Sequence, residues 1–335
     1  MAAATRSDTE RNNVPTRRRR RRRVSFRNPY PANPVVVTEL TTPTNAKIEM
    51  ASLIIVNKDD RGIVDTLNSL STLSSPIDFE VIVVDASAGS LDDIRDNFPS
   101  VRWFSLQPKA NKRTIAEQRN VGIKHSQGEV VIFLDAHCIP SAHWLDRLLY
   151  PIMEEGEDLV AGPVTSTAGS SVYDSPASES DKRYLDEAPT INLAVRKDVL
   201  RTVGPFDETI GFAEDIDFSW RATDRGYRIR QVSQATVIHY WGNVREDLRR
   251  TYRYGIGRAQ LYKKHPNRWP NLFRDDSHAL VYPAYLAGLP LTLVFWPYPL
   301  LLLIPLVVNK DSRPIHTVGH HLVYGLGVLR GLRRS

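Results

Sequence analysis

Between residues 48 and 135, short apolar runs alternate with stretches of helical spacing, and this alternation limits the possible folds more than any other feature of the chain. Three runs rich in β-branched residues predict buried strands at 51–56, 79–84 and 130–134. Helical spacing predicts helices at 60–74 and 112–126, with a short helix and a further strand at 91–97 and 101–106. Strands that are apolar throughout are covered on both faces, so the pattern predicts an α/β fold with a mostly parallel sheet between helices.

Acidic residues follow two of these strands, namely Asp85 and Asp135. In a sheet of this kind the ligand lies at the carboxyl ends of the strands. In Asp135-Ala-His137, a carboxylate and an imidazole two positions apart can point into one crevice, where together they suit a borderline divalent cation such as Mn²⁺. Alternatively, Asp135 only caps a helix that Pro140–Arg147 would begin, and the triplet alone favours neither reading.

A second acidic motif lies in residues 211–221, where Glu214, Asp215 and Asp217 occupy three of four positions. The spacing predicts a helix over 214–225, flanked by strand-like pieces at 159–163, 190–195, 228–231 and 236–239. At a helix N-terminus the dipole favours each negative charge by about 0.3–1 kcal/mol. A carboxylate held there beside a substrate hydroxyl can act as a general base. Taken by itself, the motif is better explained as a capping cluster on a surface helix.

Three more polar residues become candidates for a binding site only when they are considered together with the residues named above. His239 ends an apolar strand, where a lone histidine is more often a satisfied core residue, but with Asp135 and His137 it would complete a three-ligand metal site. Arg119 and Asn120 lie on the helix over 113–124 and could face the same crevice as Asp85. A solvated helix face explains these two residues equally well.

The positive charge belongs to one end of the chain. Of the 44 basic and 38 acidic residues, eleven and four lie in the first 50 positions, so the tail carries +7 and the rest of the chain −1. This argues against a nucleic-acid-binding fold, whose charge would lie within the domain. Residues 1–46, with the run Arg17–Arg23, are predicted to be a disordered basic tail that is solvated, contacts anionic lipid at roughly 1 kcal/mol per basic residue, or contacts nucleic acid. The single cysteine, Cys138, excludes a disulfide framework.

The C-terminal part of the chain contains a long apolar stretch. No charged residue occurs from Ala279 to Val308, and about 20 apolar residues are enough to cross a bilayer. Five prolines argue against a straight helix, so a kinked pass and a re-entrant segment both stay open. Residues 315–329 predict either a second pass or an interfacial helix. Membrane association is therefore expected, with an undetermined number of passes.

Several motifs in order resemble the family 2 glycosyltransferases of the GT-A fold. They are the strands ending at Asn57 and Asp85, Gln118-Arg-Asn-Val-Gly122, the strand through Asp135-Ala-His137, and Glu214-Asp-Ile-Asp-Phe-Ser-Trp-Arg221 with His239. The resemblance covers roughly residues 50–265. The stretch from Arg249 to Lys264, with Tyr254-Gly-Ile-Gly-Arg258, is similar to membrane-associated members that build exopolysaccharides or lipid-linked glycans.

The resemblance implies a role for each matching residue. Nucleotide-sugar binding falls to Asn57, Asp85, Arg119, Asn120 and Asp135. A divalent metal, Mn²⁺ or Mg²⁺, falls to Asp135, His137 and His239, although His137 stands where the family usually has an acid. Asp-x-His is known in polypeptide N-acetylgalactosaminyltransferases, which retain anomeric configuration. Asp215 matches the catalytic base, and Glu214 is expected to orient the acceptor.

The resemblance also implies an activity and a division of the chain. Residues 47–242 would form the GT-A catalytic domain, 243–276 a basic helical segment, and 277–335 the membrane segment or segments. The helix over 245–264 could hold a phosphorylated lipid acceptor, although a solvated amphipathic helix explains the same residues. The expected reaction is inverting transfer from a nucleoside-diphosphate sugar to a hydroxyl of a lipid-linked or polysaccharide acceptor, at the cytoplasmic face of the cell membrane. Membrane lipids are expected partners and nucleic acid is not. A retaining transferase and a non-catalytic membrane scaffold are the alternatives.

Overall fold

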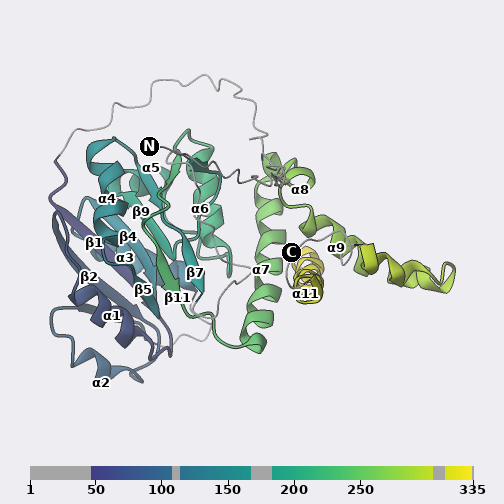
Figure 1. Ribbon diagram of the computed structural model, residues 1–335, viewed down its shortest axis with the longest axis horizontal. Helices are drawn as coiled ribbons and strands as arrows, with labels where there is room; N and C mark the ends of the chain where they lie inside the picture. Colours follow the sequence, from purple (N-terminus) through teal and green to yellow (C-terminus); the bar gives the residue numbers. More distant parts are fainter. Residues whose placement is uncertain (1–46, 108–113, 167–182, 305–313, 334–335) are drawn as a thin grey trace, which may run out of the picture. The chain divides into compact units, whose positions relative to one another are not determined.

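The computed structural model describes residues 47–107, 114–166, 183–304 and 314–333 (Figure 1). All of these residues fall within one compact unit, residues 43–335. The predicted tail over 1–46 lies outside the described residues, as do part of the loop 165–190 and the end of the apolar stretch.

In the described part of the chain, eight strands form one sheet in the order β3-β2-β1-β4-β9-β6-β10-β8. Strands β3, β2, β1 and β4 are parallel to one another. Strand β9 runs antiparallel to β4 and β6, and β8 runs antiparallel to β10, which is parallel to β6. The sheet is therefore mostly parallel, as predicted, with two reversed strands. Its members are β1 (Met50–Asn57), β2 (Asp78–Asp85), β3 (Arg102–Ser105), β4 (Val130–Asp135), β6 (Leu159–Ala161), β8 (Arg183–Leu185), β9 (Asn192–Arg196) and β10 (Ile229–Gln231).

Helices cover both faces of this sheet because its central strands are apolar on both sides. Along β1, Leu53 and Ile55 point to one face and Ile54 to the other, as the two-residue period of a strand requires. The face with Leu53 packs against α1 (Ile63–Ser71), α2 (Asp92–Arg95) and α4 (Trp144–Glu154). The face with Ile54 packs against α3 (Ile115–His125), α5 (Lys197–Val203) and α6 (Glu214–Thr223).

A second, three-stranded sheet joins segments that lie far apart in sequence. Its order is β5 (Cys138–Pro140), β11 (Val237–His239) and β7 (Val164–Ser166). The pairing places His239 opposite Cys138, the residue after His137. This small sheet therefore brings the two predicted histidine ligands to the same region.

The basic stretch after Gly242 forms one long helix, α7 (Val244–Lys264), which lies beside α11 (Pro314–Arg333) in Figure 1. Between these helices come the short turns η1 (Pro266–Arg268) and α8 (Asn271–Arg274), followed by α9 (His278–Ala287). Arg258 of α7 is half-buried, donates two 2.9 Å hydrogen bonds to Glu187, and lies 2.9 Å from Asp276. The C-terminal helices are thus ion-paired to the body that carries the large sheet.

The apolar stretch that predicted membrane association is divided into short pieces. After α9 come two 3₁₀ turns, η2 (Leu289–Leu293) and η3 (Tyr298–Leu302), each with a proline near its start. Among the described residues, we find no helix that combines the length and the apolar character needed to cross a bilayer. Several side chains of this stretch are nevertheless exposed, including Leu293 (92%), Val294 (91%) and Trp296 (75%).

Small residues let α7 and α11 approach closely, which yields a stability prediction. A Cβ at Gly327 of α11 would lie 2.1 Å from the carbonyl oxygen of Tyr252, whereas a Cβ at Gly319 of the same helix meets no atom of the described residues within 4 Å. We expect Gly327→Ala to lower the free energy of unfolding by about 1–3 kcal/mol, because the helices must separate. Gly319→Ala, the matched control, should raise it by about 0.5–1 kcal/mol through helix propensity. Urea denaturation measures both, and equal effects would contradict this account of the packing.

Candidate active site

The carboxyl ends of the central strands open into a cavity of about 670 Å³. The structure brings six of the predicted site residues to its wall: Arg119, Asp135, His137, Glu214, Asp215 and His239. They come from α3, the end of β4, the start of α6 and the end of β11. Residues separated by more than 100 positions therefore share one hollow, at the place where α/β sheets bind ligands.

A buried arginine links the two acidic motifs. Arg119 is 4% exposed, and its guanidinium hydrogen-bonds the carboxylate of Glu214 and, at 3.2 Å, that of Asp135. Burial raises the pKa of Glu214 to about 7, while the neighbouring guanidinium acts in the opposite direction. The ion pair holds the start of α6 against the end of β4, so the two motifs cannot drift apart without unpairing a buried charge.

Asp215 lies in the wall between this cavity and a second one of about 400 Å³. Its carboxylate accepts a 2.8 Å hydrogen bond from the backbone amide of Ile216, which fixes the side chain at the N-terminus of α6. Burial raises the pKa of Asp215, against the effect of Arg119. The second cavity is lined in part by α7 and α11, which contribute Tyr254 and Tyr324, and by Trp241, which precedes α7.

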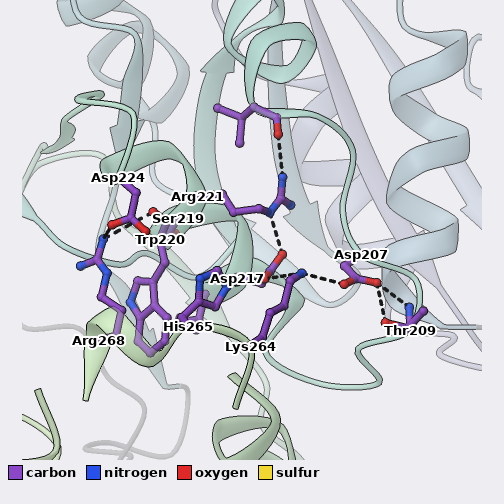
Figure 2. Close-up of polar contacts among 12 residues, drawn as sticks. Asp207, Thr209, Asp217, Ser219, Trp220, Arg221, Asp224, Lys264, His265 and Arg268 are labelled. Carbon is purple, nitrogen blue, oxygen red and sulfur yellow. Dashed lines mark hydrogen bonds and ion pairs between the residues drawn. The ribbon is translucent and has the colours of Figure 1, made fainter. Parts of the chain in front are cut away.

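The third acid of the motif, Asp217, faces away from both cavities. Figure 2 shows it between Arg221, Lys264 and His265, with contacts of 2.8, 2.7 and 2.8 Å. Lys264 also contacts Asp207 at 2.6 Å. Asp217 is fully buried, so this network fastens α6 to the C-terminal end of α7. Of the three adjacent acids, one is therefore structural.

The predicted metal ligands fit a divalent ion by their chemistry. The buried Nδ1 of His239 has no hydrogen-bond partner among the described residues, and burial lowers the pKa of this histidine. A neutral imidazole with an unused nitrogen, together with His137 and the carboxylate of Asp135, suits Mn²⁺ better than Mg²⁺. Their ligating atoms do not all lie within 4.8 Å of one another in the part of the chain that the structure describes. The ring of His137 lies instead 3.7 Å from Asp60 and 3.8 Å from Asp65.

Backbone strain gathers at the same cavity. Four non-glycine residues among those described have positive φ, and three of them line the cavity: Asp59 (58°), His137 (63°) and Ala213 (69°). Such conformations cost energy for side chains with a Cβ and persist where the surroundings fix them. A Cβ at Gly257 of α7 would lie 2.2 Å from the carbonyl oxygen of Phe212, so α7 packs tightly against the turn at Ala213.

Three predicted nucleotide-sugar residues do not line the cavity. Asn57 accepts from and donates to the backbone of Asp60, which shapes the loop after β1. Asp85 hydrogen-bonds the amide and hydroxyl of Ser87. Asn120 hydrogen-bonds the backbone of Phe206 and the side chain of Glu208, which directs it away from the cavity. Their predicted contact with the donor stays a prediction for Asn57 and Asp85, and for Asn120 it would require these hydrogen bonds to break.

Other cavity residues were missing from the sequence-based set. Asp59 and Asp60 follow the first strand, so the rule that singled out Asp85 and Asp135 could have found them. Of the basic residues on α7, Arg249, Arg250 and Arg253 line the cavity, whereas Arg258 and Lys264 are held in ion pairs of the body. The cavity thus has acidic groups at the sheet and basic groups on α7.

Comparison with known proteins identifies the family. The model of glycosyl transferase family 2 matches residues 52–207, and that of glycosyl transferase family group 2 matches residues 188–328. The chain is 31% identical to glycosyltransferase AglE of Haloferax volcanii over 226 residues, which is 63% of this chain and 73% of that protein. The chain belongs to glycosyltransferase family 2. This family 2 glycosyltransferase is also 29% identical, over 168 residues, to the pre-mycofactocin glycosyltransferase of Mycobacterium tuberculosis, of which it spans 36%.

Solved structures confirm the predicted GT-A type of α/β fold for the glycosyltransferase. The mannosyltransferase PcManGT from Pyrobaculum calidifontis, in complex with GDP-Man and Mn²⁺, matches with a TM-score of 0.63 at 15% identity, over 87% of this chain and 89% of that one. Residues 1–349 of TarS from S. aureus match with a TM-score of 0.50 at 19% identity, over 85% and 91%. At these identities the likeness is one of fold.

The Arg119–Glu214 pair of the glycosyltransferase gives a second stability prediction. Arg119→Ala should lower the free energy of unfolding by about 3–5 kcal/mol, because it leaves the buried carboxylate of Glu214 without its partner. Adding Glu214→Ala to that variant should restore part of the loss. Arg61→Ala serves as the control, since Arg61 and Asp93 form an ion pair whose side chains are 60% and 61% exposed, and its cost should be about 1 kcal/mol or less. Equal losses for Arg119 and Arg61 in urea denaturation would count against a buried, coupled pair.

Proposed function

We propose that this glycosyltransferase moves a sugar from a nucleoside-diphosphate sugar to a hydroxyl group of a lipid-linked or polysaccharide acceptor, with inversion at the anomeric carbon. The proposal is carried by the place of Asp215 in the wall between two cavities. A donor in the first cavity and an acceptor in the second would meet at its carboxylate. A carboxylate in that position can remove the proton of an attacking hydroxyl.

The charges of the first cavity support a diphosphate donor. Asp135, His137 and His239 would hold a divalent ion, Mn²⁺ or Mg²⁺, which when bound offsets the charge of a diphosphate leaving group. Arg249 and Arg253 of α7 supply positive charge from another part of the wall. The solved mannosyltransferase of similar fold is in complex with GDP-Man and Mn²⁺, which supports the same class of donor for this chain.

In the proposed reaction, the acceptor oxygen forms a bond to the anomeric carbon as the bond from that carbon to the diphosphate oxygen breaks. The diphosphate keeps the electron pair, and the acceptor proton passes to Asp215. Burial raises the pKa of Asp215, which brings a general base closer to the neutral range where it works best. Glu214 is engaged with Arg119, so it positions the start of α6 and can orient the acceptor.

The second cavity supports an acceptor with rings or apolar groups. Its aromatic side chains, Trp241, Tyr254 and Tyr324, offer flat faces for stacking. Besides Asp215, its charged side chains are Arg258 and Glu187, which pair with each other, and Arg258 also pairs with Asp276. Binding there would therefore depend more on shape and apolar contact than on charge.

The role of Asp215 can be tested with an isosteric pair of variants. We expect Asp215→Asn to lower kcat by about 10²–10⁴-fold with the fold intact, because the hydroxyl loses its general base. Asp217→Asn, two residues along the same helix but outside both cavities, should lower stability and leave turnover by the folded fraction largely unchanged. Release of nucleoside diphosphate is measured across a panel of donors with and without Mn²⁺, and NMR of the product gives its anomeric configuration. Comparable turnover by Asp215→Asn and wild type would refute the assignment.

We also propose that the enzyme acts at a membrane surface, with the catalytic domain on the cytoplasmic side. The exposed apolar side chains of residues 289–304 support insertion into the lipid interface. The basic run Arg17–Arg23 supports attraction to anionic headgroups, which the cytoplasmic leaflet carries. Two such signals together give more stable attachment than either one alone.

Vesicle binding tests this attachment. A variant with Leu293, Val294 and Trp296 all changed to Ser should bind anionic vesicles at least about tenfold more weakly, since burial of one large apolar side chain contributes about 1.5–3 kcal/mol. Tyr150→Ser on α4, also at an exposed aromatic position, is the control. Flotation in high salt screens the basic run and isolates the apolar contribution. Unchanged flotation of the triple variant would show that these side chains do not enter lipid.

A further inference from the structure

Three potential metal ligands meet where α7 packs on α11, outside the first cavity. Asp247 lies in the first turn of α7, while His316 and His320 lie one turn apart on α11. Their ligand atoms all lie within 4.8 Å of one another, and no other such group of three occurs among the described residues. Nε2 of His320 is 3.1 Å from Nε2 of His316 and 3.3 Å from Oδ2 of Asp247.

The hydrogen bonds around His320 leave a lone pair directed at the other two residues. The hydroxyl of Thr251 lies 2.9 Å from the carbonyl of Asp247 and 3.1 Å from Nδ1 of His320, and when it donates its proton to that carbonyl it accepts from Nδ1. Neutral His320 therefore carries its proton on Nδ1 and a bare lone pair on Nε2. That lone pair faces a carboxylate oxygen, and two acceptors at 3.3 Å repel each other unless a cation or a proton lies between them.

The spacing and the surroundings both fit a cation. Ligand atoms at about 2.0–2.1 Å from a tetrahedral zinc ion lie about 3.3–3.4 Å apart, close to the two distances at Nε2 of His320. Two histidines four residues apart on a helix present both imidazoles on one face, a known zinc-binding spacing. The other carboxylate oxygen of Asp247 contacts Arg250 at 3.4 Å, and Thr251 orients His320, so both ligands have supporting partners.

We propose that Asp247, His316 and His320 form a second metal site, which takes Zn²⁺ or a similar borderline divalent ion. His316 is exposed, so an ion can enter from solvent and keep water or another ligand at its open position. Burial lowers the pKa of His320, which favours the neutral ring that binds metals. The ion would tie α11 to α7 at the wall of the second cavity, which Thr251 and His320 line.

Zinc binding by the full chain tests this site separately from the catalytic cavity. All variants carry Asp135→Asn, which weakens metal binding in that cavity, and all are stripped with a chelator before titration. We expect one Zn²⁺ per chain in competition with a chromogenic chelator, a Zn²⁺-dependent rise in Tm, and a tetrahedral absorption spectrum with Co²⁺. His316→Gln, at an exposed position where folding is not at risk, should abolish all three signals.

Two further variants sharpen the result. Thr251→Val removes only the partner that orients His320 and should weaken Zn²⁺ binding by about 10–100-fold. His143→Gln is the matched control, because His143 lies 3.5 Å from Asp146 on the surface and its side chain is 66% exposed. This variant should bind Zn²⁺ as the parent does. The proposal is overturned if the parent binds no Zn²⁺, or if His316→Gln retains the bound ion and the rise in Tm.

Discussion

The candidate active site depends on the ion pairs that the buried guanidinium of Arg119 forms with Glu214 and Asp135. The start of α6 and the end of β4 place Glu214, Asp215 and Asp135 around one cavity wall, and these carboxylates would repel one another in a medium of low polarity. Arg119 offsets part of that charge from α3 through its contacts with Glu214 and Asp135. Because a buried charge without a partner costs several kcal/mol, the three elements must meet in this arrangement or leave the charges in solvent. The site is therefore a consequence of charge neutralisation as much as of chain topology.

The acidic motif on α6 shows how neighbouring residues of one type divide their roles. Glu214 is held by Arg119, Asp215 faces both cavities, and Asp217 is enclosed by Arg221, Lys264 and His265. The first and third acids hold α6 at its two sides, against α3 and against the end of α7. Only the second is placed to meet a substrate. A helix fixed on two sides can hold that carboxylate still, which the role of general base that we propose for Asp215 would require.

Local sequence patterns predicted the parallel half of the sheet because its strands are continuous apolar runs with their own helices between them. They did not predict the direction of β9, since a run of buried residues is the same for a strand in either direction and only its partners β4 and β6 decide it. Of the predicted site residues at strand ends, Asp135 and His239 line the cavity for a topological reason, whereas Asn57 and Asp85 do not line it. Asn120 does not line the cavity either, because its side-chain amide hydrogen-bonds the backbone of Phe206. These two residues are more than 80 positions apart, so no local pattern encodes the contact.

Local sequence patterns also say little about how the C-terminal region is arranged, because its composition does not determine its contacts. The uncharged stretch after residue 278 predicted membrane association with an undetermined number of passes, and its prolines divide the described part into α9, η2 and η3. The sequence did not single out the histidines of α11 as metal ligands, because Asp247 and Thr251 come to lie beside them only through the packing of α7 on α11. Their spacing of four residues was a usable signal, but the carboxylate that completes the group lies about 70 positions earlier.

Helix α7 makes the C-terminal helices part of the active site rather than an attachment to it. On one side, Gly257 packs against the strained turn at Ala213, and Arg249 and Arg253 reach the first cavity. On the other side, α7 packs against α11 through glycines and, with it, encloses the second cavity. Any displacement of α11 would therefore act on the wall beside Asp215. A lipid surface or a metal ion that fixes α11 would, by the same contacts, fix the wall of the second cavity, where we propose that the acceptor binds.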